Sequence, residues 1–190
     1  MFPISGSFNH FLWKLSEKKN LTEGNTVGLL FVDPHQTQIR DFVTNYMDVF
    51  NHESGKYIDF YLPGFRKVDG ESHYDMTISD TFWEFDPDVY NSFVGELCDR
   101  KIIKFTTSAF LLLLEIGHHR TCFNRFMKIG IDSPTINPQE VGPFFKSLFE
   151  YSKSEIEFHK IEKWVNTYIG QHFLLKNWLN ITFGVIGIIL

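Results

Sequence analysis

Cysteine is scarce in this sequence: only Cys98 and Cys122 occur among 190 residues. So few cysteines exclude a disulfide framework and are typical of proteins from reducing compartments. Residues 1–19 also lack the basic start and the continuous apolar core of a secretory signal peptide. We therefore expect a cytoplasmic protein.

The sequence also lacks the short motifs that identify common enzymes. It contains no G-x-S-x-G, no Walker A sequence, no G-x-G-x-x-G and no H-E-x-x-H. His118, His119 and Cys122 are close in sequence, but the spacing fits no usual zinc pattern, in which cysteines are paired two to four residues apart. We expect neither a metal site nor a cofactor.

Positive charge is scarce in the middle of the chain. Residues 57–100 carry 3 basic and 10 acidic side chains, whereas residues 101–190 carry 10 basic and 7 acidic ones. Nucleic-acid binding depends mainly on Lys and Arg side chains that neutralise phosphates, so an acidic surface repels this partner. The charge distribution therefore excludes nucleic acid as a partner of the middle segment.

Phenylalanine, by contrast, is abundant. The chain has 21 Phe residues, and 43% of all residues are hydrophobic while 22% are charged. This composition is typical of a globular domain, and a chain of this length buries most of its apolar surface without disulfides. We expect a core of bulky aromatic rings.

The hydrophobic periodicity predicts alternating strands and helices. Apolar residues at helical spacing predict helices at 7–19, 39–50, 86–100 and from 137 onward. Apolar or alternating runs predict strands at 26–32, 57–63, 108–116 and 121–131. Residues 63–82 are rich in turn-forming residues and predict a long loop. The order βαβαββα predicts a layered α/β domain at 1–153, with helices flanking a mixed sheet.

This order of elements resembles the thioredoxin-like fold. The resemblance rests on element order alone, because two marks of the thioredoxin site are missing. Asp33-Pro34-His35-Gln36 stands where a Cys-x-x-Cys would follow the first strand, and Phe105-Thr106-Thr107-Ser108 has no proline before the third strand. The resemblance therefore implies a thioredoxin-like topology without thiol chemistry.

The Asp33-Pro34-His35-Gln36 stretch follows the rules for starting a helix. Asp33 suits the N-cap, Pro34 the first helical position, and Gln36 the third, where its side chain can complete a capping box. Similar Asx-Pro pairs open the predicted helices at 86 and 137. A device repeated at three helix starts indicates architecture more than catalysis, and only His35 is not needed by the cap.

A catalytic alternative rests on the position of His35. In open α/β sheets, ligands bind beyond the carboxyl ends of strands, where the N-termini of helices point. A small hydrolase or transferase would use His35 as its base, assisted by Asp33, Asp59 or His118. Asp59 itself lies in mid-strand, either on an exposed sheet face or in a polar site.

The C-terminal segment, residues 154–190, is predicted to form an amphipathic helix followed by an apolar tail. A heptad-like seam joins Ile161, Val165, Tyr168, His172, Leu175 and Leu179. Residues 177–190 carry no charge but are shorter than the roughly 20 residues of a spanning helix. The tail is thus a buried strand, an interfacial anchor, or part of a membrane segment.

These observations favour a non-catalytic binding or assembly module over an enzyme. The candidate partner-binding residues are Trp83, Tyr168, Trp178 and Phe183, with a protein partner or a second copy of the chain as the expected partner. A membrane surface is the alternative partner for residues 177–190, since the segment before them is mildly basic.

Overall fold

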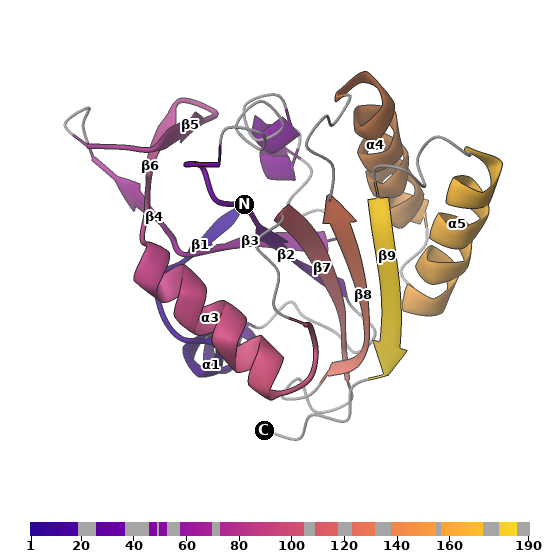
Figure 1. Ribbon diagram of the computed structural model, residues 1–190, viewed down its shortest axis with the longest axis horizontal. Coiled ribbons are helices and arrows are strands. Elements are labelled where there is room, and N and C mark those ends of the chain that lie inside the picture. The colour runs from indigo at the N-terminus through magenta and orange to yellow at the C-terminus, as the bar shows by residue number, and fades with distance from the viewer. Residues whose placement is uncertain are drawn as a thin grey trace.

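The computed structural model shows a mixed α/β protein built on a six-stranded sheet (Figure 1). It describes residues 1–18, 26–36, 46–48, 50–52, 58–69, 73–104, 109–117, 123–131, 138–154, 157–172 and 179–185. The prediction of a mixed sheet flanked by helices is therefore confirmed.

The central sheet has the strand order β1-β3-β2-β7-β8-β9. Its strands are β1 (Phe2–Ile4), β2 (Thr26–Phe31), β3 (Ile58–Pro63), β7 (Ala109–Ile116), β8 (Phe123–Ile131) and β9 (Leu179–Val185). β3 runs parallel to both β1 and β2, while β7, β8 and β9 each pair antiparallel with the preceding strand of the order. β2 and β7 are buried along most of their length, which explains their nearly continuous apolar sequences.

Helices cover both faces of this sheet. They are α1 (Phe8–Glu17), α3 (Pro87–Asp99), α4 (Pro138–Ser154) and α5 (Phe158–Gln171). Neighbouring residues of a strand point to opposite faces, and on β3 the ring of Tyr61 contacts Phe11 of α1 whereas the ring of Phe60 contacts Phe149 of α4. α1 and α3 therefore lie on one face and α4 on the other, with α5 packed on α4.

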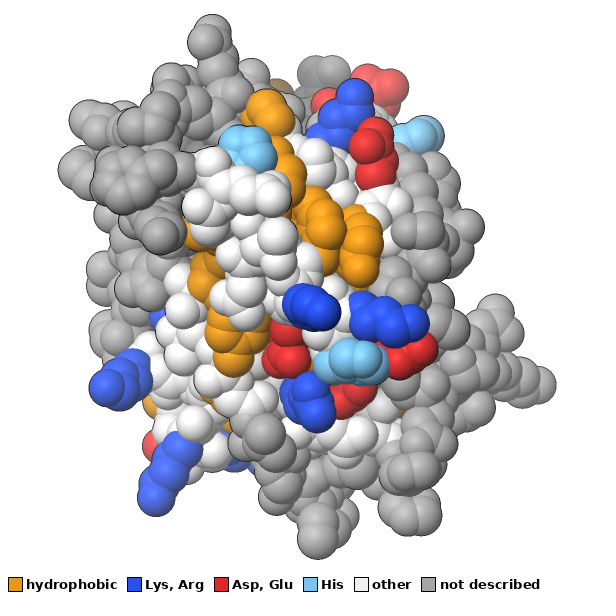
Figure 2. Space-filling model, turned by 90° about the vertical axis from the view of Figure 1, so that its right-hand side faces the viewer, with side chains coloured by type: hydrophobic (Ala, Val, Ile, Leu, Met, Phe, Trp, Pro, Cys, Tyr) orange, Lys and Arg blue, Asp and Glu red, His pale blue; other side chains and the backbone are white. Residues whose placement is uncertain are grey.

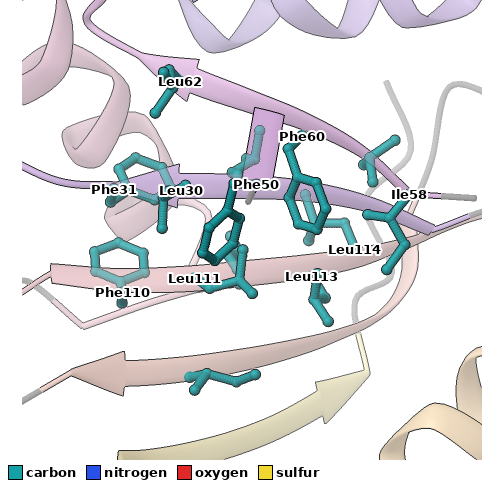
Figure 3. Close-up of a cluster of buried hydrophobic side chains, with 14 of the residues drawn as sticks. Leu30, Phe31, Phe50, Ile58, Phe60, Leu62, Phe110, Leu111, Leu113 and Leu114 are labelled. Atoms are coloured by element: carbon teal, nitrogen blue, oxygen red, sulfur yellow. The ribbon is translucent and has the colours of Figure 1, made fainter. Parts of the chain in front are cut away.

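Aromatic rings contribute the largest fully buried side chains of the core, as the composition predicted. On one face, Phe31 stacks on Phe110 with their ring centroids 4.4 Å apart. On the other face, Phe50 and Phe60 meet with ring centroids 5.2 Å apart (Figure 3). Offset and edge-on contacts of this kind add to the stabilisation from area burial alone.

The predicted loop at 63–82 is wrong. This segment contains β4 (Phe65–Val68) and β5 (Met76–Ile78), and with β6 (Thr81–Phe85) they form a second, three-stranded antiparallel sheet in the order β4-β6-β5. Phe65 of β4 and Trp83 and Phe85 of β6 are buried, so these three side chains supply a small apolar face.

The C-terminal segment also differs from the prediction. The seam lies on a helix at Ile161, Val165 and Tyr168, but α5 ends at Gln171 and Leu179 belongs to strand β9. Seven residues of the tail form a strand that pairs antiparallel with β8, but this strand lies at the edge of the sheet and is not buried in the core, since Thr182 is exposed and Ile181 and Phe183 are half-buried. Among the described residues, none of the helices has the length and apolar character needed to cross a membrane.

Candidate functional site

The turn after β2 holds Asp33 and His35 in a compact hydrogen-bonded arrangement. The backbone N–H of His35 donates to Asp33 Oδ1 at 2.9 Å, and the Gln36 side-chain amide donates to Asp33 Oδ2 at 3.4 Å. The bond from the backbone N–H of His35 is of the kind that an N-cap carboxylate makes, and the Gln36 side chain adds a second bond to the same carboxylate. Residues 37–45, where the predicted helix begins, lie outside the described residues.

His35 meets a carboxylate that comes from the second sheet. Its Nε2 lies 3.6 Å from Asp75 Oδ1, and its ring meets the ring of Phe85 edge-on, with centroids 5.8 Å apart. Asp75 is fixed in turn, because its Oδ2 accepts the backbone N–H of Phe85 at 2.6 Å. The His35 side chain is 63% exposed, so the pair lies open to solvent at the end of β2.

A buried tyrosine lies close to this pair. Tyr90 of α3 contacts the rings of Phe31 and Phe85, with centroids 5.9 and 5.4 Å away. Burial raises the pKa of Tyr90 well above its usual value, and the negative charge of Asp33 raises it further. The phenol therefore stays protonated, so Tyr90 does not serve as a base beside His35.

Asp59 does not join His35. Asp59 pairs in register with Val27 near the start of β2, whereas His35 follows the end of that strand. The Asp59 carboxylate instead binds Lys18 Nζ at 2.5 Å, and Lys18 also lies over the ring of Phe2, 4.5 Å from its centroid. Asp59 is therefore half of a structural ion pair that ties the end of α1 to β3. His118 lies outside the described residues.

The candidate partner-binding residues occupy different environments. Trp83 is only 1% exposed, so its ring offers no surface to a partner, and none of the described residues accepts a hydrogen bond from its indole N–H. Tyr168 and Phe183 are half-buried and pack against the edge of the core. Trp178 lies outside the described residues.

Tyr168 belongs to a row of rings that crosses the contact between α4 and α5, here called the aromatic ladder. It consists of Tyr151, Trp164, Tyr168 and His172, with successive ring centroids 5.2, 4.9 and 4.2 Å apart. Figure 2 shows the side of the molecule that carries α5, where a stripe of hydrophobic side chains runs beside a patch of acidic, basic and histidine side chains. Apolar and charged surface therefore adjoin on this side.

Two ion pairs lie near the start of α5. Arg125 of β8 binds Glu162 at 3.3 Å and links the helix to the sheet, whereas Lys160 binds Glu157, the N-cap residue of the same helix, at 2.9 Å. Burial raises the pKa of Glu115 on β7; the nearby Arg125 opposes this shift and the charge of Glu162 adds to it. The ionised form of Glu115 is thus less stable in the folded chain than in water.

Replacing Glu115 by glutamine is expected to stabilise the fold at neutral pH. The folded-state pKa of Glu115 lies above its unfolded value of 4.5, so the wild type loses stability as the pH rises through this window. The gain of Glu115→Gln is expected to be about 1 kcal/mol or less at pH 7 and to vanish near pH 4, because solvent screens this half-exposed group. Urea unfolding at both pH values measures it. A gain independent of pH would contradict the explanation.

Asp75 is the one site residue that sequence reasoning missed. The sequence does place Asp75 just before a short alternating stretch, but the pairing of β5 with β6 brings it to His35 only through the tertiary fold. Among the residues that the structure describes, no cluster of three His, Cys, Asp or Glu side chains could hold a metal ion.

Comparison with protein-family models, curated proteins and solved structures finds no match to this chain.

Proposed function

We propose that the protein is a non-catalytic binding and assembly module on a thioredoxin-like fold. The topology of the central sheet supports the fold: β2 and β3 are parallel neighbours, β7 and β8 follow antiparallel on the other side of β2, and helices lie on both faces. Asp33 and His35 occupy the turn where this fold would carry its redox cysteines. The module therefore works without thiol chemistry.

The aromatic ladder is the observation that carries the binding function. Tyr and Trp are enriched at protein interfaces, because they supply a large contact area at a low entropy cost. Here three such rings and a histidine follow one another across α4 and α5, with Tyr151, Trp164 and Tyr168 half-buried against the core and His172 exposed. A protein partner or a second copy of the chain would cover this row.

The absence of a disulfide framework fits a reducing, cytoplasmic location for such a module. Cys98 is a free, half-buried thiol on α3, and burial raises its pKa, which makes the thiol less reactive. An anionic membrane surface is the competing partner for the C-terminal segment, and the test below includes it.

Replacing Tyr168 by alanine is expected to weaken association at least tenfold. Sedimentation velocity from about 1 to 100 µM covers the usual range of moderate affinities. Flotation with anionic phospholipid vesicles tests the membrane as partner. The matched control is Tyr74→Ala, which removes a 45% exposed tyrosine from the second sheet's side of the molecule and should change nothing. A wild-type chain that stays monomeric and does not bind vesicles would contradict the proposal.

A small hydrolase or transferase is the second candidate, favoured by the 3.6 Å approach of His35 to Asp75. It predicts a small molecule that copurifies with the wild-type chain, detectable by mass spectrometry, and that His35→Ala releases. The binding-module proposal predicts that His35→Ala leaves association unchanged and that no such molecule is found.

A further inference from the structure

The edges of the two sheets differ in how well they are protected. A free strand edge exposes unpaired backbone groups, and proteins usually shield it with short strands, proline, charged residues or a covering segment. On the central sheet, the edge strand β1 is three residues long and contains Pro3. This edge is therefore protected by its short length and by its proline.

The edges of the three-stranded sheet are shielded as well. β4 is four residues long and exposes Arg66 and Lys67, so a strand that approached it would meet two positive charges. β5 has only three residues, which leaves too little backbone for a stable pairing.

β9 has none of these protections. It is seven residues long, and the sequence Leu179–Val185 contains no charged residue and no proline. β8 is its only neighbour among the strands that the structure describes. At about 3.4 Å per residue, this strand presents an edge of roughly 24 Å. Among the sheet edges in the described part of the chain, β9 is therefore the one that is long enough and sufficiently unprotected to pair with another strand.

β9 is also held firmly in the sheet that it would extend. Its seven residues pair with seven residues of β8 without a register shift. The ring of Phe126 on β8 covers Gly184, in the space that a side chain at this position would fill. Such packing of an aromatic ring over a strand glycine fixes the register of the edge strand. A partner strand would thus pair with a strand whose register is already fixed.

The sequence of β9 is complementary to itself. In an antiparallel pairing centred on Thr182, Ile181 of each copy lies opposite Phe183 of the other. This arrangement makes two cross-strand pairs of an aliphatic and an aromatic residue, a combination that stabilises sheets. No like charges meet, because the strand has none. A two-fold axis through Thr182 closes the assembly at two copies, since each copy offers one such edge.

We propose that a second copy of this chain pairs with β9 in antiparallel fashion about Thr182, which joins two six-stranded sheets into one continuous sheet. This inference rests on the proposed function, because it names the partner and part of the surface through which the module assembles. Ile181 and Phe183, half-buried in the single chain, become further covered in the dimer.

Thr182→Lys tests the pairing. Thr182 is exposed, so the lysine is tolerated in the monomer but brings two positive charges together at the two-fold axis. We expect the wild type to sediment as a dimer and Thr182→Lys to raise the dimer dissociation constant at least tenfold. The matched control is Thr77→Lys, which changes an exposed threonine on the short edge strand β5 and should leave the dimer intact. Equal dissociation constants for the wild type and Thr182→Lys would overturn the proposal.

A disulfide at the axis tests the geometry directly. In a background with Cys98→Ser and Cys122→Ser, Thr182→Cys brings two thiols to facing positions about 5 Å apart between their Cβ atoms, and mild oxidation should link the two chains. Thr77→Cys in the same background should stay unlinked. An associated protein in which Thr182→Cys does not crosslink would overturn the proposal.

The two proposals fail in different ways. Association that survives Thr182→Lys but is lost in Tyr168→Ala overturns the β9 pairing and supports the aromatic ladder as the association surface. A wild-type chain that stays monomeric and does not bind vesicles overturns both.

Discussion

Replacing Phe31 by alanine is expected to lower the free energy of unfolding by about 3–5 kcal/mol, as for other buried Phe→Ala changes. Phe31 is fully buried at the end of β2 and pairs in register with Phe110, on which its ring stacks at 4.4 Å. Its ring also contacts Tyr90 and Phe93 of α3 at 5.9 Å. The truncation leaves a cavity between the sheet and α3 that these large, constrained rings cannot close.

The melting temperature should fall by roughly 6–20 °C, since each kcal/mol corresponds to about 2–4 °C in a protein of this size. Thermal unfolding followed by circular dichroism measures this shift. Phe31→Leu keeps most of the volume and should cost far less. Trp13→Ala removes a large side chain that is 53% exposed and should change stability by about 0.5 kcal/mol or less. A similar loss in Trp13→Ala and Phe31→Ala would contradict the role given to the core.

The central strands and helices could be predicted because local pattern and tertiary environment agree there. Ile58, Phe60 and Leu62 alternate with more polar residues, and the structure buries these three side chains. Asp86 and Pro87 predict a helix start, and the carboxylate of Asp86 accepts the backbone N–H groups of Asp88 and Val89 at 3.0 Å. In both cases residues close in sequence determine the outcome.

The second sheet was missed because its turns use unusual residues. β5 and β6 are joined by Ser79 and Asp80, which both have positive φ angles, 45° and 60°. Hairpins with two left-handed residues usually contain Asn-Gly or Asp-Gly, so Ser-Asp gave no clear signal. Ser79 is stabilised from elsewhere in the chain, since Asp48 accepts its backbone N–H at 2.8 Å. A contact between residues 31 positions apart cannot be read from a local pattern.

The partner of His35 could not be predicted from the sequence, because it too depends on a contact between distant residues. Sequence placed Asp33 and His35 at the end of a strand, which the structure confirms, but it sought the carboxylate partner of His35 on the next strand of the predicted sheet. In a parallel pair, the N-terminal ends of the two strands lie side by side. Asp59, the second residue of β3, therefore lies opposite the N-terminal end of β2, whereas His35 follows its C-terminal end. Asp75 reaches His35 because the second sheet folds back over the end of β2.

The C-terminal segment shows how a periodic pattern can continue by chance. The heptad-like seam runs through Leu179, yet that residue lies on a strand paired with Ile131. Pairing with β8 satisfies a whole row of backbone groups, and this gain outweighs one more helical turn of modest propensity.

Replacing Gly64 by alanine is expected to destabilise the fold by about 2–4 kcal/mol, from backbone strain together with overpacking. Gly64 adopts a φ angle of +81°, which residues with a side chain rarely adopt. A Cβ atom there would lie 2.7 Å from Tyr90 Cβ and 3.0 Å from the backbone oxygen of Asp86, and neither atom is at the free end of a flexible side chain. The melting temperature should fall by roughly 4–16 °C.

The backbone of Gly64 cannot move aside to relieve this strain. Its N–H donates to the carbonyl of Ile4 at 2.9 Å, and its own carbonyl accepts the N–H of Asp86, the N-cap of α3, at 2.7 Å. A shift would therefore loosen both the shielded edge at β1 and the start of α3. Gly95→Ala is the matched control. Apart from the adjoining backbone of α3, no atom of the described residues lies within 4 Å of the added Cβ, so this change inside the helix should stabilise the protein by about 0.5–1 kcal/mol. Opposite signs for the two Gly→Ala changes would support this explanation, whereas a Gly64→Ala protein as stable as the wild type would contradict it.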